Sequence, residues 1–140
     1  YDYYGADRKG DNLYGNSVLA LDAATGNYKW HFQTVHHDIW DYDLPAPPNL
    51  VTLKKDGKEI EAVAQVTKHG FVFVLDRDTG IPIFPVEERE VPQSNIPGEF
   101  TSPTQPFPLK PAPFVKQFMT EDDLMFYSEE DHRAILEQFR

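Results

Sequence analysis

The chain has 140 residues, with 13 Lys plus Arg against 23 Asp plus Glu and a formal net charge of −10. This length suffices for one domain with its own core and is too short for two. The acidic balance argues against a protein that reads the nucleic-acid backbone, because such proteins need a basic surface. With no cysteine in the sequence, disulfide scaffolds, thiolate catalysis and cysteine-type zinc sites are excluded.

Composition divides the chain into three parts, of which the first, residues 1–86, consists of strand-like hairpins. The second, residues 87–115, is rich in proline, and nine of the 12 prolines lie between positions 82 and 113. Proline lacks the N–H group that a central strand needs, so we expect residues 102–108 to be an extended surface connection outside any sheet. The third, residues 116–140, is acidic, and Ser128 followed by acids and an apolar stripe predicts a short helix.

Two hairpin units are expected in the first part. Residues 17–22 form an apolar run, and a turn of small and polar residues separates them from residues 28–33, which alternate with period two. The same pattern returns in residues 60–67 and 71–76, followed after a second turn by residues 81–84. The first part therefore predicts antiparallel β structure.

The two units also share a motif. Leu-Asp-x-x-Thr-Gly-x-x-x-aromatic occurs with its aspartate at Asp22 and again, 54 residues later, at Asp76. A hairpin repeat of this length has the size of one four-stranded propeller blade, and its aromatic residue can dock between blades. Two unrelated hairpins remain the alternative, because such turns are common in sheet proteins.

The densest group of chemically active side chains lies in residues 34–45, which contain two histidines, three aspartates and two aromatic residues. Three interpretations are open for this loop. Its carboxylates suit calcium or magnesium, although His36 and His37 are adjacent and point to opposite sides of an extended chain. A carboxylate beside Trp40 could instead act as a general base. The aspartates could also simply cap backbone amides.

Four stretches of the sequence resemble the pyrroloquinoline quinone-dependent dehydrogenases and, within them, the membrane-bound quinoprotein glucose dehydrogenase branch. The stretches are residues 19–50, 74–80, 85–89 and 102–107. The resemblance implies that the chain is an internal fragment of an all-β protein and supplies about two blades of an eight-bladed β-propeller. The family's docking motif is complete at Ala20, Asp22, Gly26 and Trp30, whereas the second copy carries Val74 and Phe84 in place of Ala and Trp.

The resemblance also implies roles for two residues. Asp41 matches the family's aspartate that lies beside the quinone, takes the proton of the substrate hydroxyl and contacts a divalent cation, calcium or magnesium. Lys68, 27 positions later, matches the basic residue that contacts the quinone carbonyls. We therefore expect both side chains at one rim of the blades.

The implied parent enzyme oxidises glucose or another sugar or polyol and passes electrons to a membrane quinone in the periplasm, with any membrane-associated segment outside this chain. The remaining propeller blades would complete the fold, so the fragment alone is expected to be inactive. The alternative is a non-catalytic propeller module that binds a protein or carbohydrate through Trp40, Tyr42 and the nearby acids.

Overall fold

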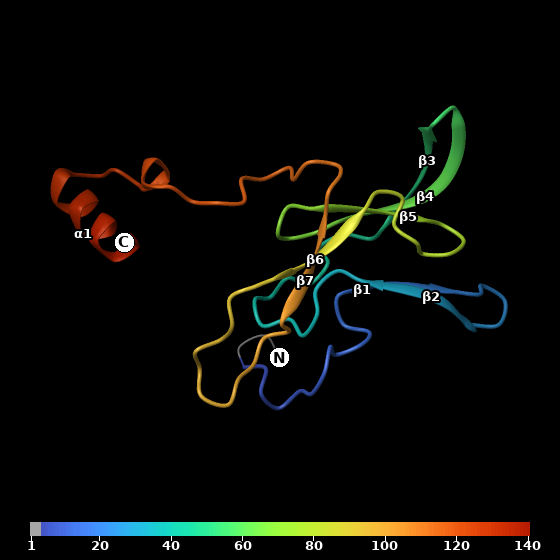
Figure 1. The fold of residues 1–140 in the computed structure, drawn as a ribbon, viewed down its shortest axis with the longest axis horizontal. Helices are drawn as coiled ribbons and strands as arrows, with labels where there is room; N and C mark the ends of the chain where they lie inside the picture. Colours follow the sequence, from blue (N-terminus) through green and yellow to red (C-terminus); the bar gives the residue numbers. More distant parts are fainter. Residues whose placement is uncertain (1–3) are drawn as a thin grey trace.

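The structure, a computed structural model, describes residues 4–140 as antiparallel β structure followed by one short α-helix (Figure 1). This confirms the expected all-β class. The strands are Ser17–Leu21 (β1), Tyr28–Gln33 (β2), Asn49–Lys55 (β3), Lys58–Val66 (β4), Val72–Asp76 (β5), Val86–Glu90 (β6) and Thr104–Pro108 (β7); a 3-10 turn spans Glu121–Asp123 (η1) and the α-helix spans Glu129–Phe139 (α1). The strands pair into three sheets, β1-β2, β3-β4-β5 and β6-β7.

The repeated motif folds in the same way in both copies. Asp22 Oδ1 accepts hydrogen bonds from the amides of Ala24 and Thr25 and from the Thr25 hydroxyl, at 2.8 to 3.1 Å. Asp76 Oδ1 accepts the same three bonds from the corresponding residues of the second turn, within the same range of distances. The glycine that follows has a φ of +73° in both turns. The shared motif therefore encodes one turn geometry twice.

Trp30 joins the first hairpin to the second turn. Its side chain is buried, with 8% of the residue exposed, as the docking motif predicted. The indole N–H donates to the carbonyl oxygen of Arg77 at 3.1 Å, and the ring lies so close to Gly80 that a Cβ there would come within 2.5 Å of it. The positive φ and the close contact both require glycine at position 80.

The second unit contains one strand more than the sequence predicted. Strands β4 and β5 form the expected hairpin, and β3 lies on the other side of β4, with Asn49 opposite Ala64. The expected final strand, residues 81–84, is reduced to one bridge between Leu75 and Pro82. Pro82 cannot donate a backbone hydrogen bond, which limits pairing at this point.

The expectation that residues 102–108 lie outside any sheet is wrong, because β7 pairs with β6 over five residue pairs. The Leu109 amide donates to the carbonyl oxygen of Pro85, and the Val91 amide donates to that of Pro103. These two bonds determine which residue pairs between β6 and β7 exchange hydrogen bonds. Pro106 and Pro108 consequently fall at the positions that do not exchange hydrogen bonds with β6. The N–H groups that these prolines lack would point away from the partner strand, so the strand tolerates both prolines.

One hydrophobic core connects the three sheets. Phe73 and Leu75 of β5 are fully buried at its centre. Phe73 contacts Phe32 of β2, with ring centroids 5.2 Å apart, while Phe71 contacts Phe107 of β7 at 5.5 Å. Hairpins from different parts of the sequence thus hold each other in place, which fixes the loops at their ends.

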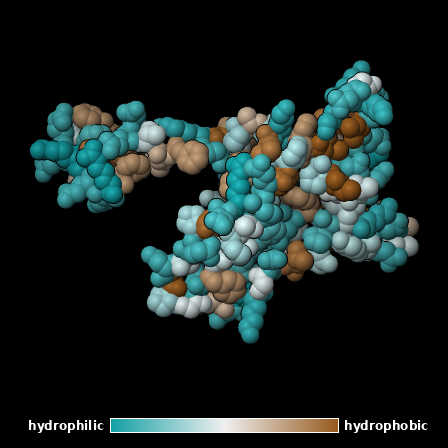
Figure 2. Space-filling model, viewed as in Figure 1, coloured by the Kyte–Doolittle hydropathy of each residue, from teal (hydrophilic) through white to brown (hydrophobic). Residues whose placement is uncertain are grey.

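The end of the chain leaves the sheets as an extended arm that carries η1 and α1 (Figure 1). Helix α1 begins where predicted, because the Ser128 side chain accepts a hydrogen bond from the Asp131 amide. The arm presents large apolar and aromatic side chains to solvent: Phe118, Met119, Met125, Phe126 and Tyr127. Tan atoms are visible along the arm in Figure 2. Within residues 4–140, no helix combines the length and apolar character needed to cross a membrane.

Candidate active site

The loop of residues 34–48 and the turn of residues 67–71 meet at one end of the sheets. The loop has no regular secondary structure and runs from β2 to β3, while the turn joins β4 to β5. Strands β3 and β4 are hydrogen-bonded neighbours, so the end of the loop enters the sheet that carries the turn. Asp41 and Lys68 lie on these two segments.

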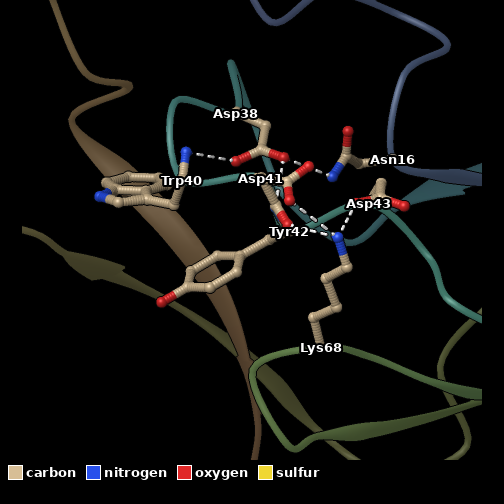
Figure 3. A network of polar contacts seen from close by, with 7 residues as sticks. All are labelled: Asn16, Asp38, Trp40, Asp41, Tyr42, Asp43 and Lys68. Atoms are coloured by element: carbon tan, nitrogen blue, oxygen red, sulfur yellow. Dashed lines mark hydrogen bonds and ion pairs between the residues drawn. The ribbon is translucent and has the colours of Figure 1, made fainter. Parts of the chain in front are cut away.

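The Lys68 amine binds the loop through three contacts, drawn in Figure 3. It donates to the carbonyl oxygen and to Oδ2 of Asp41, both at 3.0 Å, and forms an ion pair with Asp43. The two residues expected at one rim are therefore in direct contact. Asp43, to which the family resemblance assigned no role, is the additional member of this group.

Two carboxylates share one ammonium group at this position, which leaves one negative charge in excess. The hydrogen bonds with Asp43 and then Asp41 raise the pKa of Lys68 above its ordinary value. The hydrogen bond from Lys68 lowers the pKa of Asp43. Lys68 is therefore a cation and Asp43 an anion at neutral pH. The side chain of Asp41 is 60% exposed, so a substrate or a metal ion can approach it.

The backbone at Asp41 has an uncommon conformation, with a φ of +59°. This left-handed region is unfavourable for residues other than glycine, although aspartate tolerates it better than most. In this conformation the carbonyl oxygen and the side chain of Asp41 both reach the Lys68 amine. The loop geometry is thus part of what creates the contact.

Aromatic side chains surround the cluster on one side. The rings of Trp40 and Tyr42 stack with centroids 5.9 Å apart, and Tyr42 lies 5.0 Å from His69. Burial lowers the pKa of His69 to about 4, so its imidazole is neutral at pH 7. These three residues, with Phe71, Phe107 and others, line a pocket of about 640 Å³.

The two adjacent histidines of the loop do not share a site. The ring of His36 contacts the side chains of Gln33 and Glu88, at 2.7 and 3.2 Å. The ring of His37 is buried and contacts the carbonyl oxygen of Gly10 at 2.8 Å. The two rings contact different segments, as expected, but the chain is not extended here because His37 has a φ of +45°.

Asp41 and Asp43 provide the oxygen donors that calcium and magnesium prefer. Among residues 4–140, no group of three or more carboxylate, imidazole or thiolate side chains is arranged to hold a metal ion. Calcium takes six to eight oxygen ligands. The chain therefore fits as the source of part of a metal site, to which other segments of the protein would contribute.

The whole chain, residues 1–140, matches the family described as the β-propeller domain of PQQ glucose, ethanol and alcohol dehydrogenases. The chain belongs to this family. The match confirms the expected propeller architecture and identifies the family's cofactor as pyrroloquinoline quinone, as the resemblance implied.

Two curated relatives show how much of a family member the chain represents. It is 46% identical to the probable quinate dehydrogenase (quinone) of Xanthomonas campestris pv. juglandis over 88% of its own length and 16% of that protein. It is 49% identical to the quinoprotein glucose dehydrogenase of Gluconobacter oxydans over 75% of its length and 13% of that protein. The chain thus corresponds to an internal portion of these dehydrogenases.

Two solved structures share the fold of the chain. The quinohemoprotein alcohol dehydrogenase of Comamonas testosteroni has a TM-score of 0.54 and 34% identity, covering 76% of this chain and 16% of that one. A europium-containing methanol dehydrogenase has a TM-score of 0.52 and 31% identity, covering 60% and 16%. One structurally similar enzyme of this group is therefore described as containing a metal.

Proposed function

We propose that the protein containing this chain is a pyrroloquinoline quinone-dependent dehydrogenase that oxidises glucose or another sugar or polyol, with Asp41 as its general base. The observation that supports this role is the contact of the exposed Asp41 carboxylate with the Lys68 ammonium group. A module that only binds a protein or carbohydrate has no need of a carboxylate held in this way beside a cation. Membership of the dehydrogenase family supports the same conclusion.

Oxidation of an alcohol removes a hydride from carbon and a proton from the hydroxyl group. Bound pyrroloquinoline quinone supplies the electron-pair acceptor for this reaction. Asp41 takes the hydroxyl proton, which it can do because its side chain is exposed to solvent. Lys68 is held in its charged form by Asp43 and Asp41, and this ammonium group would hold the quinone carbonyls and stabilise negative charge there when the cofactor is bound.

Asp41 has a second proposed role as a ligand of calcium or magnesium. The excess negative charge at Asp41, Asp43 and Lys68 favours a cation at this point. The other ligands come from parts of the protein outside this chain.

The names of several relatives support the proposed substrate class. They include quinate, glucose and glycerol dehydrogenases, and these compounds all carry several hydroxyl groups on carbon. We extend this class, a sugar or polyol, to the protein that contains this chain. We further propose a membrane quinone as electron acceptor, a periplasmic location and completion of the site by the remaining blades.

The test uses the full-length protein, freed of cofactor and metal and then supplied with pyrroloquinoline quinone and either calcium or magnesium. Turnover is followed with an artificial electron acceptor on glucose, quinate and glycerol in parallel. The proposal predicts turnover of at least one of the three that depends on both the cofactor and the metal. Binding of carbohydrate without turnover under all these conditions would instead identify a binding module.

A further inference from the structure

We propose that Asp38 is a positioning residue that holds Asp41 in its reactive conformation. The inference rests on the proposed role of Asp41 as general base. Asp38 lies three residues before Asp41 in the same loop and does not contact Lys68. Its part is to fix the backbone on both sides of Asp41 and to tie the loop to the segment that precedes β1.

The first step of the argument is the pair of amides that flank Asp41. Oδ1 of Asp38 accepts a hydrogen bond from the Trp40 amide at 2.9 Å, and Oδ2 accepts one from the Tyr42 amide at 2.7 Å (Figure 3). One carboxylate thus binds the residue before Asp41 and the residue after it. Because the amides on both sides of Asp41 are held, its backbone is constrained to the observed φ of +59°.

The second step is the anchor outside the loop. Asn16 Nδ2 donates to Oδ2 of Asp38 at 3.0 Å, and the Arg8 guanidinium donates to the Asp38 carbonyl oxygen at 2.6 Å. The side chain of Asp38 is partly buried at this junction. Asn16 directly precedes β1, and its carbonyl oxygen accepts hydrogen bonds from the amide and the hydroxyl group of Thr34. The loop is therefore held against a sheet and not only by its own turns.

The third step separates Asp38 from the reacting group. Both of its carboxylate oxygens accept N–H donors, three of them among residues 4–140. Asp41, in contrast, is exposed and contacts the Lys68 amine. The sequence left open whether the loop aspartates act as a general base or cap backbone amides. In the structure Asp38 caps backbone amides, while Asp41 is placed to react.

Asp38→Asn is the informative variant because it keeps the shape of the side chain. Its amide group must put an NH₂ donor where one carboxylate oxygen now accepts N–H groups, so at least one flanking bond is lost. Misplacing a catalytic group by about 1 Å can cost roughly 100-fold in rate. We expect Asp38→Asn to lower kcat of the full-length holoenzyme roughly 10- to 100-fold at saturating metal, with a small change in KM.

The chain offers a matched control in Asp22, which accepts two backbone amides and one side-chain donor in a hairpin turn, as Asp38 does in the loop. Asp22→Asn would keep these contacts, because Oδ1 alone accepts all three of them. Asp22→Ala removes them, away from Asp41. It should leave kcat within about twofold of the wild type. A second probe is Asn16→Gly, which removes the side-chain donor but keeps the left-handed backbone of position 16, where φ is +51°. It should lower kcat less than Asp38→Asn does.

Two measurements distinguish positioning from general loss of stability. In a double-mutant cycle, adding Asp38→Asn to Asp41→Asn should cost little further rate, because the group that Asp38 positions is already gone. In the full-length protein without cofactor, hydrogen exchange of a peptide covering residues 38–43 should be faster in Asp38→Asn than in the wild type. Asp22→Ala should not change the exchange of this peptide.

The outcomes are separable from those of the proposed function. An active Asp38→Asn beside an inactive Asp41→Asn overturns the positioning role alone, as do fully additive losses in the double variant or unchanged exchange at residues 38–43. Full activity of Asp41→Asn overturns the assignment of Asp41 as general base, and the positioning role with it, whereas the dehydrogenase activity itself is tested by turnover that depends on cofactor and metal.

Discussion

Trp30 packs against Gly80, so the aromatic residue of the first motif copy rests on the glycine of the second. The indole ring approaches the position of a Gly80 Cβ to 2.5 Å, and the indole N–H is bonded to the Arg77 carbonyl oxygen at 3.1 Å. The repeated motif therefore does two things in this chain. It shapes each turn locally, and it connects the β1-β2 hairpin to the end of β5.

Gly80→Ala should destabilise the full-length protein more than Gly26→Ala. Both glycines have a φ of +73°, so both variants bear the left-handed strain of about 1–2 kcal/mol. Only at Gly80 does the new methyl group collide with Trp30, whereas a Cβ at Gly26 meets nothing within 4 Å. Overpacking adds about 1–3 kcal/mol. Calorimetric melting temperatures should rank wild type above Gly26→Ala above Gly80→Ala, and equal shifts for the two variants would contradict the docking.

Stability should fall on acidification in a way that depends on His69. Its folded pKa is about 4, against 6.5 for an unperturbed histidine, because burial disfavours the charged form. Between these values the unfolded chain binds a proton that the folded chain excludes, so the contribution is complete above pH 6.5 and is lost as the pH falls toward 4. Melting temperatures of wild type and His69→Gln should therefore converge or cross as the pH decreases through this range. Parallel curves would show that His69 is not buried in its neutral form.

Hairpins that follow from local sequence patterns were predicted correctly. Strands β3 and β7 were missed, and the pairing of β7 depends on its register with a strand distant in the sequence. Strand β3 follows a signal that was present, because Asp56-Gly57 between alternating segments favours a tight hairpin turn, and both residues have positive φ. Strand β7 was excluded because proline lacks a donor. The nitrogen of Pro106 points toward or away from β6 according to the register of the two strands, which lie about 20 residues apart in the sequence. Composition does not reveal this register.

The candidate site was predictable only in part for a similar reason. Resemblance to a family and a spacing of 27 residues identified Asp41 and Lys68. Asp43 and Asp38 lie in the same acidic loop. The roles of carboxylates so close in the sequence cannot be told apart without the backbone conformation of the loop. The contact of Asn16 with Asp38 spans 22 residues and has no sequence motif. The structure assigns the contacts of each aspartate by placing the loop against its neighbours.

The isolated 140-residue chain should show no dehydrogenase activity when pyrroloquinoline quinone and calcium or magnesium are supplied. It spans 16% of the relative from Xanthomonas and offers Asp41 and Asp43 as only part of a metal site. The assay compares it with the full-length protein at equal molar concentration and with the same electron acceptor. Turnover by the isolated chain above the background without protein would show that it contains a sufficient site.

Lys68→Ala should lower kcat of the full-length enzyme, because it removes the charge proposed to stabilise the reduced cofactor and the anchor of the Asp41 carboxylate. Lys68→Arg should recover part of the rate, since it keeps the charge and changes only the geometry. Lys116 is a matched control, because it too pairs with an aspartate but lies on the extended arm. If Lys116→Ala and Lys68→Ala reduce kcat equally, the specific role of Lys68 is wrong.

The most direct test of the proposed chemistry is the kcat of Asp41→Asn in the full-length holoenzyme at saturating metal. Asparagine keeps the size of the side chain and an acceptor for Lys68, but it cannot take a proton. Saturating metal separates the loss of the base from weaker binding of the cation. We predict that kcat falls roughly 10²- to 10⁴-fold, the usual cost of removing a general base. A kcat equal to that of the wild type would contradict the assignment of Asp41 as the base.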